Sequence, residues 1–76
     1  MALEAIVNLE GVYRVILEQY AEGVYVLVYD TPELSNESPC EDHLQNDWNM
    51  AKLAALQDYG VTDDLWREIP DTGIMG

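Results

Sequence analysis

The tetrapeptide Glu-Gly-Val-Tyr occurs at residues 10–13 and again at 22–25, and it separates three segments with a period of two. Across residues 2–30 the odd positions are apolar almost throughout, whereas the even positions mix apolar and charged residues. This alternation is typical of antiparallel strands with one face more buried than the other. We therefore expect three strands, near residues 2–8, 12–20 and 24–30, joined as a meander.

The glycine of each repeat predicts a three-residue hairpin loop, at 9–11 and at 21–23, because such loops commonly place glycine in the left-handed conformation. Loops of this length pair residue 8 with 12 and residue 20 with 24, which keeps all odd positions on one face. The same register places Arg14 opposite Asp30, where the two could form a cross-strand ion pair. We interpret the repeat as one kind of turn used twice, since the segments that flank it differ.

A surface loop is expected over residues 31–37, which are rich in proline, serine, asparagine and acid. Residues 38–41, Ser-Pro-Cys-Glu, have the composition of a capping box at a helix start. Gly60 suits the left-handed position that ends a helix. The sequence therefore predicts a helix over residues 39–59.

One stripe of this expected helix is apolar and is predicted to face the sheet. Its members are Cys40, Leu44, Trp48, Ala51, Ala55 and Tyr59. Met50, Leu53 and Leu56 fall outside the stripe. They either widen the buried face or form a second contact surface.

The C-terminal part begins with Thr62 and two acids, which predict a single helical turn. A short edge strand is expected near 66–69, because Pro70 prevents a longer element. Residues 70–76 are expected to form a turn and a frayed tail. The predicted fold is α+β, a three-stranded antiparallel meander packed against one α-helix, in a single domain over residues 1–76.

The charge is strongly unbalanced, with 15 acidic and 3 basic residues and a formal net charge of -12. This charge opposes direct binding to nucleic acid or to an anionic membrane, and it favours a basic protein partner. The lone Cys40 cannot form an intramolecular disulfide, and the N-terminal residues lack the basic region of a signal peptide. No apolar run approaches the length of about 18 residues that spans a membrane. We expect a soluble, cytoplasmic protein.

Cys40 and His43 are the best pair of nucleophile and base in the chain, three residues apart at the expected helix start. The neighbouring acids Glu41 and Asp42 disfavour a thiolate, so a buried Cys40 and an exposed His43 are the preferred interpretation. A structural zinc site needs about four ligands, and one cysteine with one histidine supplies two. Phosphate-binding and hydrolase motifs are also missing from the sequence. The sequence predicts no catalytic residue, no metal site and no cofactor.

Two surface features predict contact with a protein partner. The first is the even face of the meander, which is more apolar than a solvated face requires and includes Ile6, Ile16, Val24, Val26 and Val28. Either the C-terminal Leu65, Trp66 and Ile69 cover this face, or a second protomer packs on it to give a homodimer. Open strand edges offer a third route to association. The second feature is acidic and is represented by Glu41, Asp42, Asp63 and Asp64.

These observations favour a non-enzymatic protein-interaction or regulatory module. The alternative is an acidic inhibitor that imitates nucleic acid and occupies the binding groove of a basic protein. An enzyme that uses Cys40 and His43 ranks third.

Overall fold

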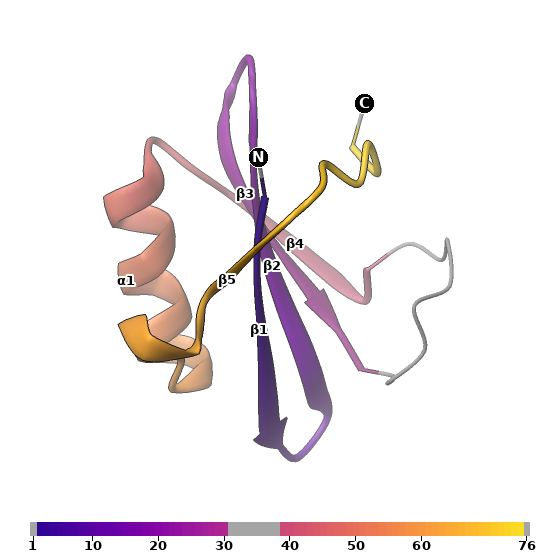
Figure 1. Cartoon of the computed structure of the whole chain (residues 1–76), viewed down its shortest axis with the longest axis vertical. Helices are drawn as coiled ribbons and strands as arrows, with labels where there is room; N and C mark the ends of the chain where they lie inside the picture. The colour runs from indigo at the N-terminus through magenta and orange to yellow at the C-terminus, as the bar shows by residue number, and fades with distance from the viewer. Residues whose placement is uncertain (1, 31–38, 76) are drawn as a thin grey trace.

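The structure, a computed structural model, describes residues 2–30 and 39–75. Its elements are β1 (Ala2–Leu9), β2 (Val12–Tyr20), β3 (Gly23–Tyr29), β4 (Glu41–Gln45), α1 (Trp48–Tyr59), the 3-10 helix η1 (Asp63–Leu65) and β5 (Arg67–Ile69). Within these ranges the strands form one five-stranded antiparallel sheet in the order β4-β3-β2-β1-β5. In Figure 1, α1 lies on one side of the sheet, and the chain passes through β5 to a C-terminal turn on the other. The α+β class is confirmed, but the three-stranded sheet is wrong, because β4 and β5 extend the meander at both edges.

The first hairpin has the predicted register over most of its length. Leu3 pairs with Leu17 and Ala5 with Val15, so the odd residues of β1 and β2 share one face. The register shifts between Ile6 and Leu9, close to the turn, where Gly11 has a φ of 80°. Leu9 pairs with Val12 at the turn, so the predicted pairing of residue 8 with residue 12 is wrong there, and the shift restores odd residues opposite odd residues farther along the strands.

The second hairpin has a different register from the predicted one. Tyr20 pairs with Gly23, and the shift persists along the strands, since Leu17 pairs with Val26. The even residues of β3 therefore share a face with the odd residues of β2. The predicted ion pair of Arg14 with Asp30 is wrong for the same reason: Arg14 lies opposite Tyr29, with its guanidinium carbon 4.5 Å from the ring centroid.

A tertiary contact with β4 requires glycine at position 23. Its φ is 149°, and a Cβ atom at this position would lie 2.3 Å from the carbonyl oxygen of Gln45. A side chain would therefore push β4 away from β3. The glycine of the first repeat serves a turn, whereas that of the second lets two strands approach closely.

Helix α1 begins at Trp48, so the predicted start at residue 39 is wrong. Residues 41–45 pair with β3 as an edge strand, and this sheet pairing outweighs the local helix signal. Ser38 and the predicted loop at 31–37 lie outside the described residues. The observed N-cap is Asp47, whose side chain accepts a hydrogen bond from the Met50 amide at 2.9 Å.

The predicted end of the helix is confirmed. Gly60 adopts the left-handed conformation, with a φ of 69°, and its amide donates to the carbonyl of Leu56 at 3.0 Å. After it, the predicted helical turn and edge strand are present as η1 and β5. β5 pairs with β1 through Ala2 and Ile69 at one end and Glu4 and Arg67 at the other.

Apolar side chains form a cluster on each side of the sheet. On the α1 side, small helix residues let the helix lie close to the strands, and the buried members are Ala5, Val7, Val15, Leu17, Val24, Val26, Val28, Ala51, Ala55, Tyr59 and Val61. On the other side, C-terminal residues pack over the strands, and the cluster comprises Ala2, Ile16, Leu27 and Tyr29 with Tyr25, Ile69, Ile74 and Met75 against it. The expectation of a frayed tail is therefore wrong through residue 75. Cys40 and Leu44, predicted for the helix stripe, are exposed.

Two glycine substitutions test the contact between β3 and β4. Gly11→Ala is expected to destabilise the chain by about 1 to 2 kcal/mol, because its positive φ disfavours a side chain but no other atom lies within 4 Å of the new Cβ. Gly23→Ala adds the collision with the Gln45 carbonyl to the same backbone effect, so this variant should lose more unfolding free energy than Gly11→Ala. Urea unfolding of both variants measures the difference. An equal loss would show that β4 does not require glycine at this position.

Candidate protein-interaction surface

The five apolar residues predicted to bind a partner do not form one exposed face. Val24, Val26 and Val28 lie between the sheet and α1, and each is at most 1% exposed. Ile16 is buried on the other side, and Ile6 is 44% exposed. The prediction of a shared face is wrong, because the register of the second hairpin turns the even residues of β3 toward the helix.

The C-terminal residues cover the sheet within the chain, which was one of the two predicted alternatives. Ile69 packs with Ile74 and Met75 over the cluster that contains Ile16. The other two residues predicted for this role lie elsewhere. Trp66 packs on the α1 side, and Leu65 is 40% exposed.

The four predicted acidic residues are all exposed, but they lie in two places. Glu41 and Asp42 belong to β4, at one edge of the sheet. Asp63 and Asp64 belong to η1, which contacts β1 near the opposite edge. Two strands, β2 and β3, separate the two pairs.

Cys40 and His43 do not form a catalytic pair. Cys40 lies in a bend directly before β4, and among the described contacts none joins its thiol to the His43 ring. Partial removal from water raises the pKa of the Cys40 thiol although the residue is largely exposed, and the charges of Asp30 and Glu41 raise it further. This environment disfavours the thiolate that a nucleophile needs.

His43 instead lies against Tyr59 of α1. The Tyr59 hydroxyl is 3.4 Å from His43 Nε2, and it donates a hydrogen bond to Glu41 Oε2 at 3.3 Å. Burial, followed by the nearby Glu41 carboxylate, raises the pKa of Tyr59 to about 12. These contacts fasten the end of α1 to β4 and hold the phenol in its neutral form.

Buried charge, which was not expected from the sequence, lies on the side of the sheet away from α1. Glu4 and Arg14 are each 3% exposed. Arg67 donates to Glu4 Oε1 from Nε and Nη2 at 3.1 and 2.8 Å, while Arg14 Nη1 lies 3.6 Å from Glu4 Oε2. The available signal was parity, since these charged residues occupy even positions of β1 and β2 on one face.

Glu18, 2% exposed, is held by backbone and hydroxyl donors. Its carboxylate accepts hydrogen bonds from the Thr72 amide and hydroxyl, from the Gly73 amide at 3.1 Å and from the Tyr20 hydroxyl at 2.9 Å. Burial alone would raise the pKa of Glu18. The hydrogen bonds outweigh burial, and the pKa lies below its ordinary value of 4.5.

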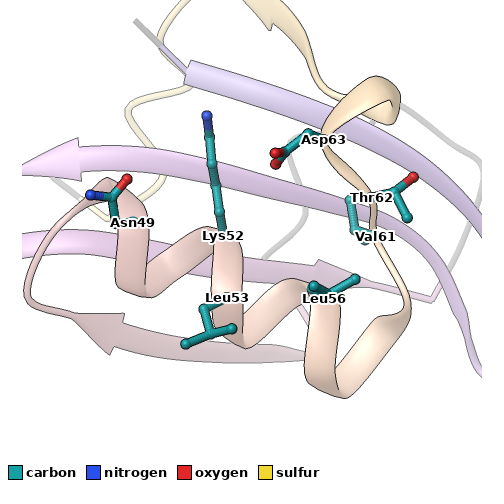
Figure 2. Close-up of a pocket in the computed structure, with 7 residues that line it drawn as sticks. All are labelled: Asn49, Lys52, Leu53, Leu56, Val61, Thr62 and Asp63. Atoms are coloured by element: carbon teal, nitrogen blue, oxygen red, sulfur yellow. The ribbon is translucent and has the colours of Figure 1, made fainter.

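A groove runs between α1 and the chain that follows it, as Figure 2 shows. The groove has a volume of about 430 Å³ and is lined by Asn49, Lys52, Leu53, Leu56, Val61, Thr62 and Asp63. We call this the α1 groove. Met50, Leu53 and Leu56 are 44%, 45% and 47% exposed, so they do not widen the buried face. The alternative, that they form a second contact surface, stays a prediction.

Within residues 2–30 and 39–75, histidine, cysteine and acidic side chains nowhere gather in groups of three or more that could hold a metal ion. Over the same ranges, no helix combines the length and apolar character needed to cross a membrane. No family model, curated protein or solved structure matches the chain. The function therefore has to be argued from the surfaces described above.

The stability of the chain at alkaline pH reports on Tyr59. Since its pKa rises from 10.0 to about 12 on folding, the stabilisation linked to the neutral phenol is complete below pH 10 and is lost as the pH rises toward 12. Tyr59→Phe lacks this titration. We expect the difference in unfolding free energy between wild type and variant to shrink over this range in urea titrations. A difference independent of pH would contradict the assignment.

A second substitution tests the hydrogen bonds at Glu18. Glu18→Gln is expected to lower the free energy of unfolding by about 2 kcal/mol at neutral pH. The amide has one acceptor oxygen, whereas hydrogen-bond donors surround both carboxylate oxygens. Since the folded pKa is lowered, the stabilisation is present above pH 4.5 and is lost as the pH falls below it. The variant should lack this acid-dependent loss in urea unfolding. The control, Glu10→Gln, changes an exposed acid, and an equal effect there would refute the assignment.

Proposed function

We propose that the protein is a non-enzymatic interaction module whose α1 groove binds a basic, amphipathic segment of a partner protein. The observation that supports this proposal is the row of Met50, Leu53 and Leu56 on the outer side of α1, each close to half exposed. Large apolar side chains that gather on one element beside a groove are typical of a helix-binding surface.

The distribution of exposed apolar residues favours this surface over others. Seven large hydrophobic residues are exposed in the described part of the chain, and four of them belong to α1 and η1. The other three, Ile6, Leu9 and Leu44, are divided between β1 and β4. Both faces of the sheet are already covered by other parts of the chain.

Charge favours a basic partner at this place. Asp58, Asp63 and Asp64 are exposed on α1 and η1, and the chain has a formal net charge of -12. A basic segment would be attracted over a distance and oriented by these acids. The aliphatic stem of Lys52 adds apolar surface to the groove.

The alternative function, an acidic surface that imitates nucleic acid, has less support. Such a surface requires a continuous row of negative charge, whereas two strands separate the pair Glu41 and Asp42 from the pair Asp63 and Asp64. An interaction module with a local apolar groove requires no such row.

Binding of a synthetic amphipathic helix of leucine and lysine, labelled with a fluorophore, tests the proposal by anisotropy. Leu53→Ser and Leu56→Ser should each weaken binding about fivefold, because burial of the exposed half of a leucine contributes about 1 kcal/mol. Ile6→Ser is the matched control, since Ile6 is 44% exposed but lies on β1.

Charge is tested with the same peptide at low and high salt. The double variant Asp63→Asn and Asp64→Asn should bind more weakly at low salt and show a smaller salt dependence than wild type. Binding that is unchanged by both leucine substitutions, or that Ile6→Ser weakens equally, would place the partner elsewhere.

A further inference from the structure

Residues 67–75, here called the C-terminal segment, are attached at one end through Glu4. β5 adds three residues to the edge of β1, and the Arg67 guanidinium binds the buried Glu4 carboxylate at 2.8 Å. Arg67 itself is exposed. Strand pairing and an ion pair therefore fix this end of the segment.

The other end is attached through Glu18 and Tyr20. The amides of Thr72 and Gly73 donate to the Glu18 carboxylate, and the Met75 amide donates to the Tyr20 hydroxyl at 3.2 Å. Ile69, Ile74 and Met75 pack on the apolar cluster of the sheet. A carboxylate bound by successive backbone amides resembles the way proteins hold a separate ligand.

The hydrogen bonds show that this segment is bound like a peptide. Arg67, Thr72, Gly73 and Met75 donate hydrogen bonds to side chains of β1 or β2. The Ile74 amide donates to the Thr72 hydroxyl at 3.3 Å. Addition of a strand to a sheet edge, with side chains in neighbouring pockets, is a common mode of peptide recognition. The receptor in this case is the sheet, and the peptide is part of the same chain.

We infer that the sheet face around Glu4 and Glu18 is a peptide-binding site, and that the C-terminal segment of a second copy fills it when two chains exchange these segments. The contacts in trans are the same as those in cis, so an exchanged dimer loses none of them. Exchange of identical elements is a low-cost route to dimers. A segment of another sequence would have to reproduce the arginine, the threonine and the glycine at their spacing.

The connection between α1 and β5 permits this exchange. Val61 and Trp66 of this connection pack in the cluster on the α1 side, but η1 between them contains no buried residue, so a change of direction confined to η1 exposes little apolar surface. Trp66 would then move with the segment and pack in the same way on the second copy. Figure 1 shows the chain leaving the end of α1 and crossing the sheet to reach the C-terminal turn. Movement of this connection would carry the whole segment away from its own sheet.

Charge and concentration set the conditions for the dimer. Two chains with a formal charge of -12 each repel one another, so salt should favour the dimer by screening. A tethered segment has an effective concentration on the order of millimolar, so exchange competes with the closed monomer at about 1 mM protein. The basic partner of the α1 groove has the opposite salt dependence, which separates the two proposals.

Disulfide trapping tests the exchange. Leu3 and Glu68 are paired across β1 and β5, so Leu3→Cys and Glu68→Cys in a Cys40→Ser background can form a bond between these strands. Oxidation at about 10 μM should give disulfides within one chain. At about 1 mM and high salt, covalent dimers on a non-reducing denaturing gel should increase about tenfold or more.

A matched cysteine pair controls for random collisions. Tyr25→Cys and Leu44→Cys join β3 to β4, which take no part in the exchange, and should remain within one chain at both concentrations. Test-pair disulfides that stay within one chain at about 1 mM, or dimers equally abundant with the control pair, would overturn the inference.

The unsubstituted chain provides a measurement that does not depend on engineered cysteines. Cys40 is exposed and adjoins β4, at the sheet edge opposite β5, so a fluorophore there leaves the C-terminal segment untouched. Donor- and acceptor-labelled samples, mixed at about 1 mM, should develop energy transfer that disappears on dilution. Leu53→Ser should leave this transfer unchanged, because it alters the α1 groove alone. Absence of transfer in the wild type would also overturn the inference.

Discussion

Two carboxylates buried on one face of the sheet determine much of the structure. A buried carboxylate destabilises a fold by several kcal/mol unless cations or hydrogen-bond donors surround it. Glu4 and Glu18 obtain these partners largely from the end of the chain, through Arg67, Thr72 and Gly73. The need to neutralise them therefore explains why β5 joins β1 and why the C-terminal segment lies across the sheet. The same segment covers the apolar residues on the side of the sheet away from α1.

This arrangement also affects the outer surface. The chain has three basic residues, and two of them, Arg14 and Arg67, lie at Glu4. Most acids in the described ranges are exposed, and Lys52 is the one basic residue that lies away from Glu4. An acidic exterior around an apolar groove is attractive to a basic amphipathic partner and repels a second copy of the same chain. Opposite responses to salt follow for the two kinds of association.

Sequence reasoning succeeded where a local signal decides the structure. Gly11, Gly60 and Pro70 correctly marked the first turn, the helix end and the limit of the last strand, because backbone conformation at these residues depends on their own chemistry. It failed where a distant contact decides. Gly23 serves the approach of Gln45, and residues 41–45 join β3 although the sequence before them favours a helix start. The leucines of the α1 groove were recognised as lying outside the buried stripe, but the groove itself forms only when residues 61–63 return beside the helix.

The position of Lys52 has a chemical consequence. It is the one lysine in the sequence, so its side chain carries the chain's single ε-amine, and this amine belongs to the wall of the α1 groove (Figure 2). Enzymatic acylation, ubiquitin attachment or a reagent that joins amines would act on a lysine at this surface and at no other in the chain. Any such modification would alter the charge and the shape of the groove together. The surface proposed for the partner is therefore also the place where lysine chemistry would act.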